Sequence, residues 1–350
     1  MANPIANLQR ISAEYSQMDK KDKRRFWTDG ILNNALYILM LAFCIYTAIK
    51  QPNFVSWGSL GNLIVQVAAY LPMALGIAGC IVLTGTDLSA GRVCGLTAAV
   101  TGVFLQKSDF ANKMFTSLPE VNGWWIAATL LTVIAIGALI GLVNGFFVAK
   151  FSLHPFIVTL STQLITRSLA QIISNGQAIP MSIGNFPQVY SGYLGPIPLP
   201  IIYMLVVFIV MYILMHQTRF GRYVYAVGGN VNAAIASGVN VFWVRTACYT
   251  ISGFLAGLAG IIITAKTTSG QSNIGIGYET DAVAACVLGG TSFAGGISTA
   301  PGVVIGAIMI GCIYTGMNFL RIGSYYQQLA KGLIIIGAIM LDMAVSKKNR

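Results

Sequence analysis

Long apolar runs separated by short polar segments restrict the fold of this chain more than any other sequence feature. A helix of about 20 apolar residues crosses the roughly 30 Å hydrocarbon core of a membrane. Only 9% of the residues are charged, whereas a soluble protein carries about a quarter, so a soluble enzyme, a disordered chain and a coiled coil are excluded. The expected class is therefore an all-α, polytopic helical membrane protein. The predicted spans are 31–49, 61–83, 93–106, 124–149, 153–173, 199–215, 243–265, 300–320 and 325–344.

One further apolar run, 281–289, is too short for a complete span, because a helix of that length reaches only about 14 Å. This run and the short span 93–106 adjoin Gly-rich polar stretches, which predicts about ten transmembrane segments, some of them broken. With 281–289 counted as a crossing, most of the 21 Lys and Arg residues fall on one side, which the positive-inside rule assigns to the cytoplasm. The transmembrane domain 31–344 is then flanked by two basic cytoplasmic tails, 1–30 and 345–350.

Residues that would carry out chemistry are scarce. The six cysteines lie in or beside apolar runs without CxxC spacing, and the two histidines stand far apart, so we expect no metal site and no cofactor. The sequence has no HExxH, no GxSxG and no paired catalytic carboxylates. We therefore expect no catalytic residues, and the net charge of +11 indicates membrane orientation rather than nucleic-acid binding.

An internal repeat interrupts two apolar stretches, because VLTGTDLSAG (82–91) aligns with VLGGTSFAGG (287–296). Non-helical backbone inside a membrane is tolerated only against protein or a water-filled cavity, and paired Gly interruptions point to a transport pathway. The alternative is that the glycines only allow close helix packing. We expect the two copies to run parallel, and Asp87 and Arg92 are near enough in sequence to pair, either in a gate or as a structural pair at the membrane edge. The candidate pathway or gate residues are Thr84, Thr86, Asp87, Ser89, Gly91, Arg92, Asp281, Gly290, Thr291, Ser292 and Gly296.

The segment 216–242 is a long loop on the predicted cytoplasmic side. Gly228 and Gly229 are interpreted as turn residues. A short helix is predicted after them, with Asn230 as its N-cap and Gly238 as its stop. The segment is too apolar for a solvated connector, and a short amphipathic helix of this kind fits the groove of a partner protein.

This loop resembles the coupling-helix region of binding-protein-dependent ABC import permeases. Their EAA-xxx-G pattern falls on residues 232–238, with Asn232 where the pattern has Glu. TRFGR (218–222) and AVGGN (226–230) resemble the branch that imports sugars such as ribose and galactose. TGTDLSAGR (84–92) is similar to the GG-IDLSVG-S motif of that branch. Its departures at Thr86, Ala90 and Arg92, like YETDAVAACVLGG (278–290), resemble galactose/methyl-galactoside permeases.

The resemblance covers about residues 31–344 and implies the permease subunit of an ATP-driven importer in the bacterial inner membrane. The cargo would be a monosaccharide, with galactose, a methyl galactoside or glucose first. The sequence has no P-loop, so a separate cytoplasmic ABC ATPase is expected to dock on 216–242. The coupling residues implied are Arg219, Gly221, Arg222, Gly228, Gly229, Asn230, Ala233, Ala234 and Gly238.

The other partners implied are a periplasmic sugar-binding protein or lipoprotein, a second copy of the chain and membrane lipids, with no nucleic acid. The binding protein would land on the opposite loops, 107–123, 174–198 and 266–280. Ribose, another pentose, a furanose signal or a nucleoside are alternative cargoes, and a heterodimer of permeases is an alternative assembly. A second alternative is an ion-coupled secondary transporter, which the lack of an acidic relay through the spans disfavours.

Overall fold

The computed structural model describes Asp19 and residues 35–107, 109–110, 121–181 and 186–348. Apart from Asp19, the predicted N-terminal tail 1–30 lies outside the described residues. The helices run α3 (Ala35–Lys50), η1 (Pro52–Val55), α4 (Trp57–Val82), α5 (Ala90–Phe104), α6 (Gly123–Lys150), α7 (Pro155–Ser174), α8 (Gln188–Ser191), α9 (Leu199–His216), α10 (Arg219–Gly229), α11 (Val231–Ala236), α12 (Val241–Thr267), α13 (Tyr278–Leu288), α14 (Ala300–Phe319) and α15 (Ser324–Lys348).

The helical membrane architecture is confirmed. Within the described residues, six helices are long and apolar enough to cross a membrane, namely α4, α6, α7, α9, α12 and α14. Shorter apolar helices form at Tyr37–Lys50 and Ala90–Phe104, and α13 has only 11 residues, as its short apolar run predicted. The last helix continues to Lys348, so the predicted tail 345–350 begins as part of α15.

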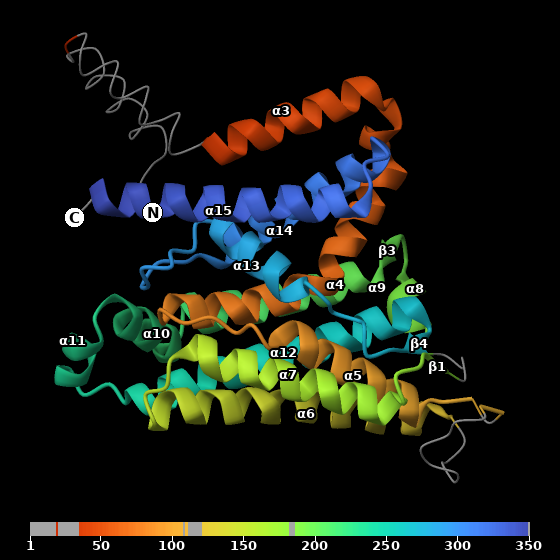
Figure 1. The fold of residues 1–350 in the computed structure, drawn as a ribbon, viewed down its shortest axis with the longest axis horizontal. Coiled ribbons are helices and arrows are strands. Elements are labelled where there is room, and N and C mark those ends of the chain that lie inside the picture. Colours follow the sequence, from red (N-terminus) through yellow and green to blue (C-terminus); the bar gives the residue numbers. More distant parts are fainter. Residues whose placement is uncertain (1–18, 20–34, 108, 111–120, 182–185, 349–350) are drawn as a thin grey trace.

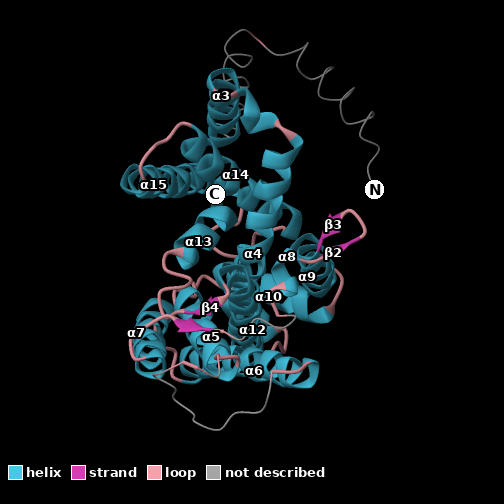
Figure 2. Ribbon diagram, turned by 90° about the vertical axis from the view of Figure 1, so that its right-hand side faces the viewer, coloured by secondary structure: helices cyan, strands magenta, loops and turns pink. Residues whose placement is uncertain are grey.

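The long helices lie roughly side by side (Figure 1), with α4 at the centre. We compared the buried share of the most apolar 18-residue stretch in each helix. This share is 83% in α4 and 72% in α12, but only 22% in α6, α7 and α9. Figure 2 shows α3, α14 and α15 on one side of α4 and α13, and α5, α6, α7 and α12 on the other. The peripheral helices therefore leave apolar faces for lipid or for another protein.

Helices α6 and α12 pack closely through small residues. Gly137, Gly141 and Gly145 follow one another at four-residue spacing on α6, and a Cβ atom at any of them would overlap the backbone of α12. This is small-xxx-small packing. The alternative interpretation of glycine as a packing residue therefore holds for these positions.

The two ends of the bundle differ. At one end, β1 (Ile179–Pro180) pairs antiparallel with β4 (Ser269–Gly270), and an isolated bridge joins Gln106 to Met181. The hairpin of β2 (Tyr193–Leu194) and β3 (Ile197–Pro198) lies at the same end. The described parts of the three loops predicted as landing sites for a binding protein thus lie at this end, which we call the strand end.

Helices α10 and α11 occupy the other end (Figure 1), which we call the α10 end. The short predicted helix is present as α11, with the side chain of Asn230 accepting a hydrogen bond from the Ala233 amide at 3.0 Å. Gly238 follows with a φ of +80°. The interpretation of Gly228 and Gly229 as turn residues was wrong, because both lie in the last turn of α10. Packing against neighbouring backbone overrides their weak helix propensity at this site.

Candidate functional site

The two repeat segments contact each other at the α10 end. The amide of Gly296, in the second copy, donates a hydrogen bond of 3.0 Å to the carbonyl of Val82, in the first. Helix α4 ends at Val82 and α13 at Leu288, and each is followed by a turn into the next helix. The two copies therefore run in the same direction, in agreement with the parallel orientation expected from the sequence.

Helix α10 joins this contact through Gly228. A Cβ atom at Gly228 would overlap the Val82 carbonyl and lie 2.8 Å from the Gly296 amide nitrogen. Gly295 has a φ of +88°, and its own Cβ would lie 2.5 Å from the Gly228 carbonyl oxygen. The contact is made mainly by backbone, with the Thr84 methyl group also against Gly295, so a side chain at Gly228 or Gly295 would not fit. We call Val82, Gly228, Gly295 and Gly296 the glycine junction.

Asp87 lies in a buried network of hydrogen bonds beyond this junction. Its carboxylate accepts from the amide and hydroxyl of Ser89 at 3.0 and 2.6 Å and from the hydroxyl of Ser252 at 2.7 Å. Asn144 donates to the Ser89 hydroxyl at 2.9 Å and accepts from the Thr162 hydroxyl at 2.5 Å. The network therefore ties the first repeat segment to α6, α7 and α12.

The expected pairing of Asp87 with Arg92 is wrong. Among the described residues the one salt bridge that the structure shows joins Lys331 to Asp281, and the Asp87 carboxylate is bound by serine hydroxyls instead. Arg92, in the first turn of α5, lies within electrostatic range of Glu279 on α13. A Cβ atom at the neighbouring Gly91 would overlap the carboxylate of Glu279, so the two short apolar helices meet at this point.

The other candidate pathway residues are distributed over three places. In the second repeat segment Gly290 has a φ of +81°, and the Thr291 hydroxyl shares a hydrogen bond of 2.7 Å with the hydroxyl of Ser298, just after the segment. Thr84 lines a small cavity of about 240 Å³ at the same end, beside Arg245. Asp281 lies elsewhere, in the wall of a larger cavity. The predicted set is therefore not one continuous lining within this chain.

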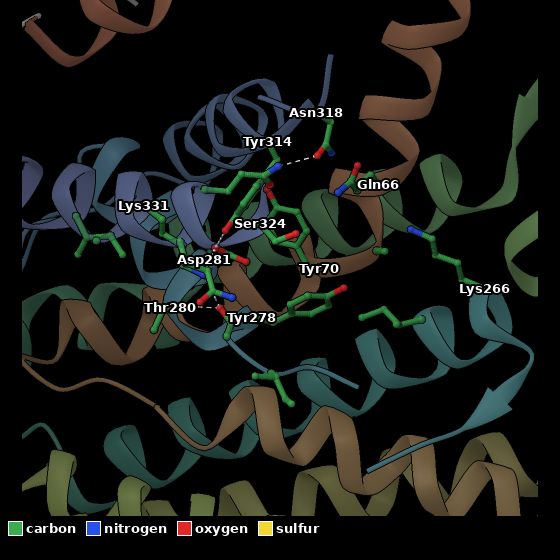
Figure 3. Close-up of a pocket in the computed structure, with 18 residues that line it drawn as sticks. Gln66, Tyr70, Lys266, Tyr278, Thr280, Asp281, Tyr314, Asn318, Ser324 and Lys331 are labelled. Carbon is green, nitrogen blue, oxygen red and sulfur yellow. Dashed lines mark hydrogen bonds and ion pairs between the residues drawn. The ribbon is translucent and has the colours of Figure 1, made fainter. Parts of the chain in front are cut away.

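The larger cavity has a volume of about 570 Å³ and lies among α4, α12, α13, α14 and α15 (Figure 3). Tyr70, Tyr278 and Tyr314 line it, so we call it the tyrosine cavity. The rings of Tyr70 and Tyr278 are 6.4 Å apart. Its other polar lining residues are Gln66, Lys266, Thr280, Asp281, Asn318, Ser324, Gln327, Gln328 and Lys331.

A salt bridge crosses the wall of this cavity. The Lys331 ammonium lies 2.6 Å from the Asp281 carboxylate and donates a second bond of 3.1 Å to the Gly277 carbonyl. The Tyr314 hydroxyl donates to Asp281 at 3.0 Å. Asp281 was among the residues selected from the sequence, whereas Lys331 and the three tyrosines were not. The sequence contained one indication of this pair, because two residues of opposite charge inside apolar segments, Asp281 and Lys331, each need a partner.

The residues predicted for ATPase coupling divide into two groups by burial. Gly221, Gly228 and Ala234 are buried, and Cβ atoms at Gly221 and Gly228 would overlap backbone. These three therefore hold α10 and α11 against the bundle. The remainder form an exposed surface, together with Ile235, whose side chain is 57% exposed. The exposed residues of the predicted set are Arg219, Arg222, Gly229, Asn230, Ala233 and Gly238.

Comparisons with known proteins cover nearly the whole chain. The model of the family described as branched-chain amino acid transport system / permease component matches residues 59–341. The chain is 38% identical over 334 residues to the galactose/methyl galactoside import permease protein MglC of Escherichia coli, covering 93% of this chain and 97% of that one. It is 35% identical over 325 residues to the ribose import permease protein RbsC of the same species, covering 91% and 96%. It is 31% identical over 338 residues to the D-allose transport system permease protein AlsC, covering 97% and 98%. No solved structure matches.

Proposed function

The chain belongs to the family described as branched-chain amino acid transport system / permease component, and we propose that it is the membrane-spanning subunit of an ATP-driven importer. The names of its relatives lead us to propose monosaccharides as the cargo. Galactose or a methyl galactoside is the first candidate cargo, since the relative that carries this name is 38% identical over almost the full length. Ribose and D-allose follow, at 35% and 31% identity of their relatives. The six apolar spanning helices supply the membrane path that such a subunit needs.

We place the α10 end in the cytoplasm and the strand end outside. Exposed Arg219 and Arg222 lie at the α10 end, and basic residues collect on the cytoplasmic side of membrane proteins. An ABC ATPase docks there on the exposed surface of α10 and α11, and a sugar-binding protein docks on the strand end. A second copy of the chain provides the other half of a twofold assembly that matches a pair of ATPase sites.

The glycine junction is the single observation that carries this mechanism. ATP binding moves the ATPase surface that holds α11, and α10 carries the movement to Gly228. Because Gly228 touches backbone of both repeat segments, a shift of α10 displaces the turn after α4 and the turn before α14 together. These turns must have two conformations, one for each stage of transport. Docking of the ATPase drives transport only if the ATPase binds one of these conformations more tightly than the other.

The docking surface is tested by the substitution Gly238→Arg. Gly238 has a positive φ, and a Cβ atom there would meet nothing within 4 Å, so Arg adds bulk at the proposed interface and moderate backbone strain. The matched control is Gly176→Arg, because Gly176 also has a positive φ, of +68°, and open space, but lies after α7 at the strand end.

The expected result is that Gly238→Arg loses co-purification of the ATPase subunit and loses sugar uptake, whereas Gly176→Arg keeps the ATPase. Affinity purification of the tagged chain from membranes, followed by an ATP hydrolysis assay, measures this. If no nucleotide-hydrolysing subunit co-purifies with the unchanged chain, the importer proposal fails.

A further inference from the structure

The tyrosine cavity is a compartment that the coupling mechanism does not use. We propose that it is a transit site for a neutral polyhydroxy ligand of monosaccharide size, an inference that rests on the proposed function and adds the place where the cargo pauses inside one copy of the chain. The site lies among α4, α12, α13, α14 and α15 (Figure 3), not in the repeat segments.

The cavity has the size and the mixture of surfaces that such a ligand needs. Its volume of about 570 Å³ lies within the range of about 300–1,000 Å³ for small-molecule sites. Tyr70, Tyr278 and Tyr314 supply ring surface from three different helices. Aromatic faces pack against the C–H groups of a sugar ring, while convergent polar groups fix its orientation.

Free hydrogen-bonding groups face the cavity beside groups that are already bonded. The hydroxyl of Tyr70 donates to the Ala307 carbonyl at 2.6 Å, and that of Tyr314 donates to Asp281. Within the described part of the chain, the side-chain amide of Gln66 and the hydroxyl of Tyr278 have no such bond. An amide and a phenol can each donate and accept, which suits ligand hydroxyls.

The charges around the cavity favour a neutral ligand. Asp281 and Lys331 neutralise each other at 2.6 Å, and Lys331 also bonds the Gly277 carbonyl. The remaining charged lining residue, Lys266, is exposed and lies 5.6 Å from the centre of the Tyr190 ring. The pair leaves Asp281 and Lys331 without a net charge that a ligand would have to neutralise, and a neutral sugar can bind beside it without breaking it. Lys266 is then the one lining cation without a carboxylate partner among the described residues.

The position of the cavity fits the binding of a ligand early in its passage from the strand end to the α10 end. Lys266 is adjacent to β4, and Ser324 begins α15 after the short turn from α14. Both lie toward the strand end, whereas the glycine junction closes the α10 end. A ligand that enters from the strand end would reach the tyrosine cavity before the junction.

The test fills the cavity without disturbing its walls. Gly332 lines the cavity, and a Cβ atom there has no neighbour within 4 Å, so Gly332→Trp has room for its backbone while its ring occupies the cavity. Gly337→Trp is the matched control, because Gly337 lies on the same helix with the same open surroundings and does not line the cavity. A milder pair is Gln66→Leu, with Gln163→Leu on α7 as its control.

The assay measures uptake of radiolabelled galactose, ribose and D-allose by vesicles that contain the assembled importer and its binding protein, together with ATP hydrolysis. We expect Gly332→Trp to lower maximal uptake at least about tenfold and Gln66→Leu to lower it about fivefold, as for one lost hydrogen bond. Hydrolysis should stay within about twofold of the unchanged importer, since the coupling contacts are untouched, and both controls should match it.

Several outcomes overturn the proposal. Unchanged uptake by Gly332→Trp shows that cargo does not pass through the cavity, while the proposed function stands. Equal loss of uptake and hydrolysis in both variants, in a complex that still assembles, shows that the cavity acts on coupling and is not a transit site. Absence of uptake of all three sugars by the unchanged importer removes the proposed function and the transit site together.

Discussion

The glycine junction and the tyrosine cavity are built from parts of the same bundle in opposite ways. At the junction, backbone meets backbone and a single methyl group would not fit at Gly228. In the cavity, long side chains surround about 570 Å³, and polar groups such as the amide of Gln66 and the hydroxyl of Tyr278 have no hydrogen bond within the described part of the chain. Close-packed contacts transmit displacement because they cannot deform, whereas an open polar cavity can bind a ligand. The comparison assigns the transmission of movement to the glycine junction and ligand binding to the tyrosine cavity, and substitutions in each region test this assignment.

The largest effect is expected from Gly228→Ala. The added methyl overlaps the Val82 carbonyl, which is backbone and cannot turn aside, so we expect a loss of about 3 kcal/mol in stability and a loss of transport. The control is Gly229→Ala, where a Cβ meets nothing within 4 Å. Thermal unfolding of the solubilised chain measures the difference. Equal midpoints for the two variants would show that the junction has more room than its geometry indicates.

The next largest effect concerns the salt bridge of the cavity. Asp281→Ala leaves the partly buried Lys331 without its carboxylate, and we expect a loss of about 2 kcal/mol. The double variant Asp281→Ala with Lys331→Met removes both charges and should recover most of that stability. Denaturation of the unchanged chain, the single variant and the double variant in the same detergent measures these differences in stability. A double variant as unstable as the single one would contradict the role of the pair.

A smaller effect is expected in the Asp87 network. Ser252→Ala removes one of the hydrogen bonds to the buried carboxylate, which should cost about 1.5 kcal/mol because the acceptor is charged. Ser161→Ala is the control, since the Ser161 hydroxyl only bonds the Ile157 carbonyl on its own exposed helix face. Unfolding midpoints measure the effect, and indistinguishable midpoints would show that Asp87 does not depend on Ser252.

The smallest effect is expected at the docking helix. Asn230→Ala removes the N-cap of α11 and should weaken that helix by about 1 kcal/mol, which lowers the recovery of ATPase on purification without changing the stability of the bundle. The control is Asn122→Ala, which removes the equivalent N-cap of α6 at the strand end and leaves the cap of α11 intact. Recovery of ATPase activity from both variants is the measurement, and identical recovery argues against α11 as the docked element.

The elements of the fold were largely predictable because they depend on local patterns. The spans, the short α13 and the cap of α11 follow from apolar run length and from the type of residue at Asn230. Helix α10 was missed because Gly228 and Gly229 are turn residues in isolation, and only the contact of Gly228 with the repeat segments shows why glycine is needed at that position of a helix.

The contacts of the candidate site were much less predictable. Asp87 was expected to pair with Arg92, five residues away, but its partner Ser252 is 165 positions distant. Likewise, the walls of the tyrosine cavity come from helices far apart in the chain. Sequence spacing indicates neighbours on one helix, whereas these contacts are set by how whole helices pack.

The hydrogen bond between Gly296 and Val82 has a mechanical consequence. It ties two helix hairpins together at their bends. Farther along the same helices the Tyr70 hydroxyl bonds the Ala307 carbonyl, and a Cβ atom at Gly311 would overlap the Val67 side chain. Helices α4 and α14 are therefore joined along their length, so a push on α10 is expected to shift them together as one rigid unit.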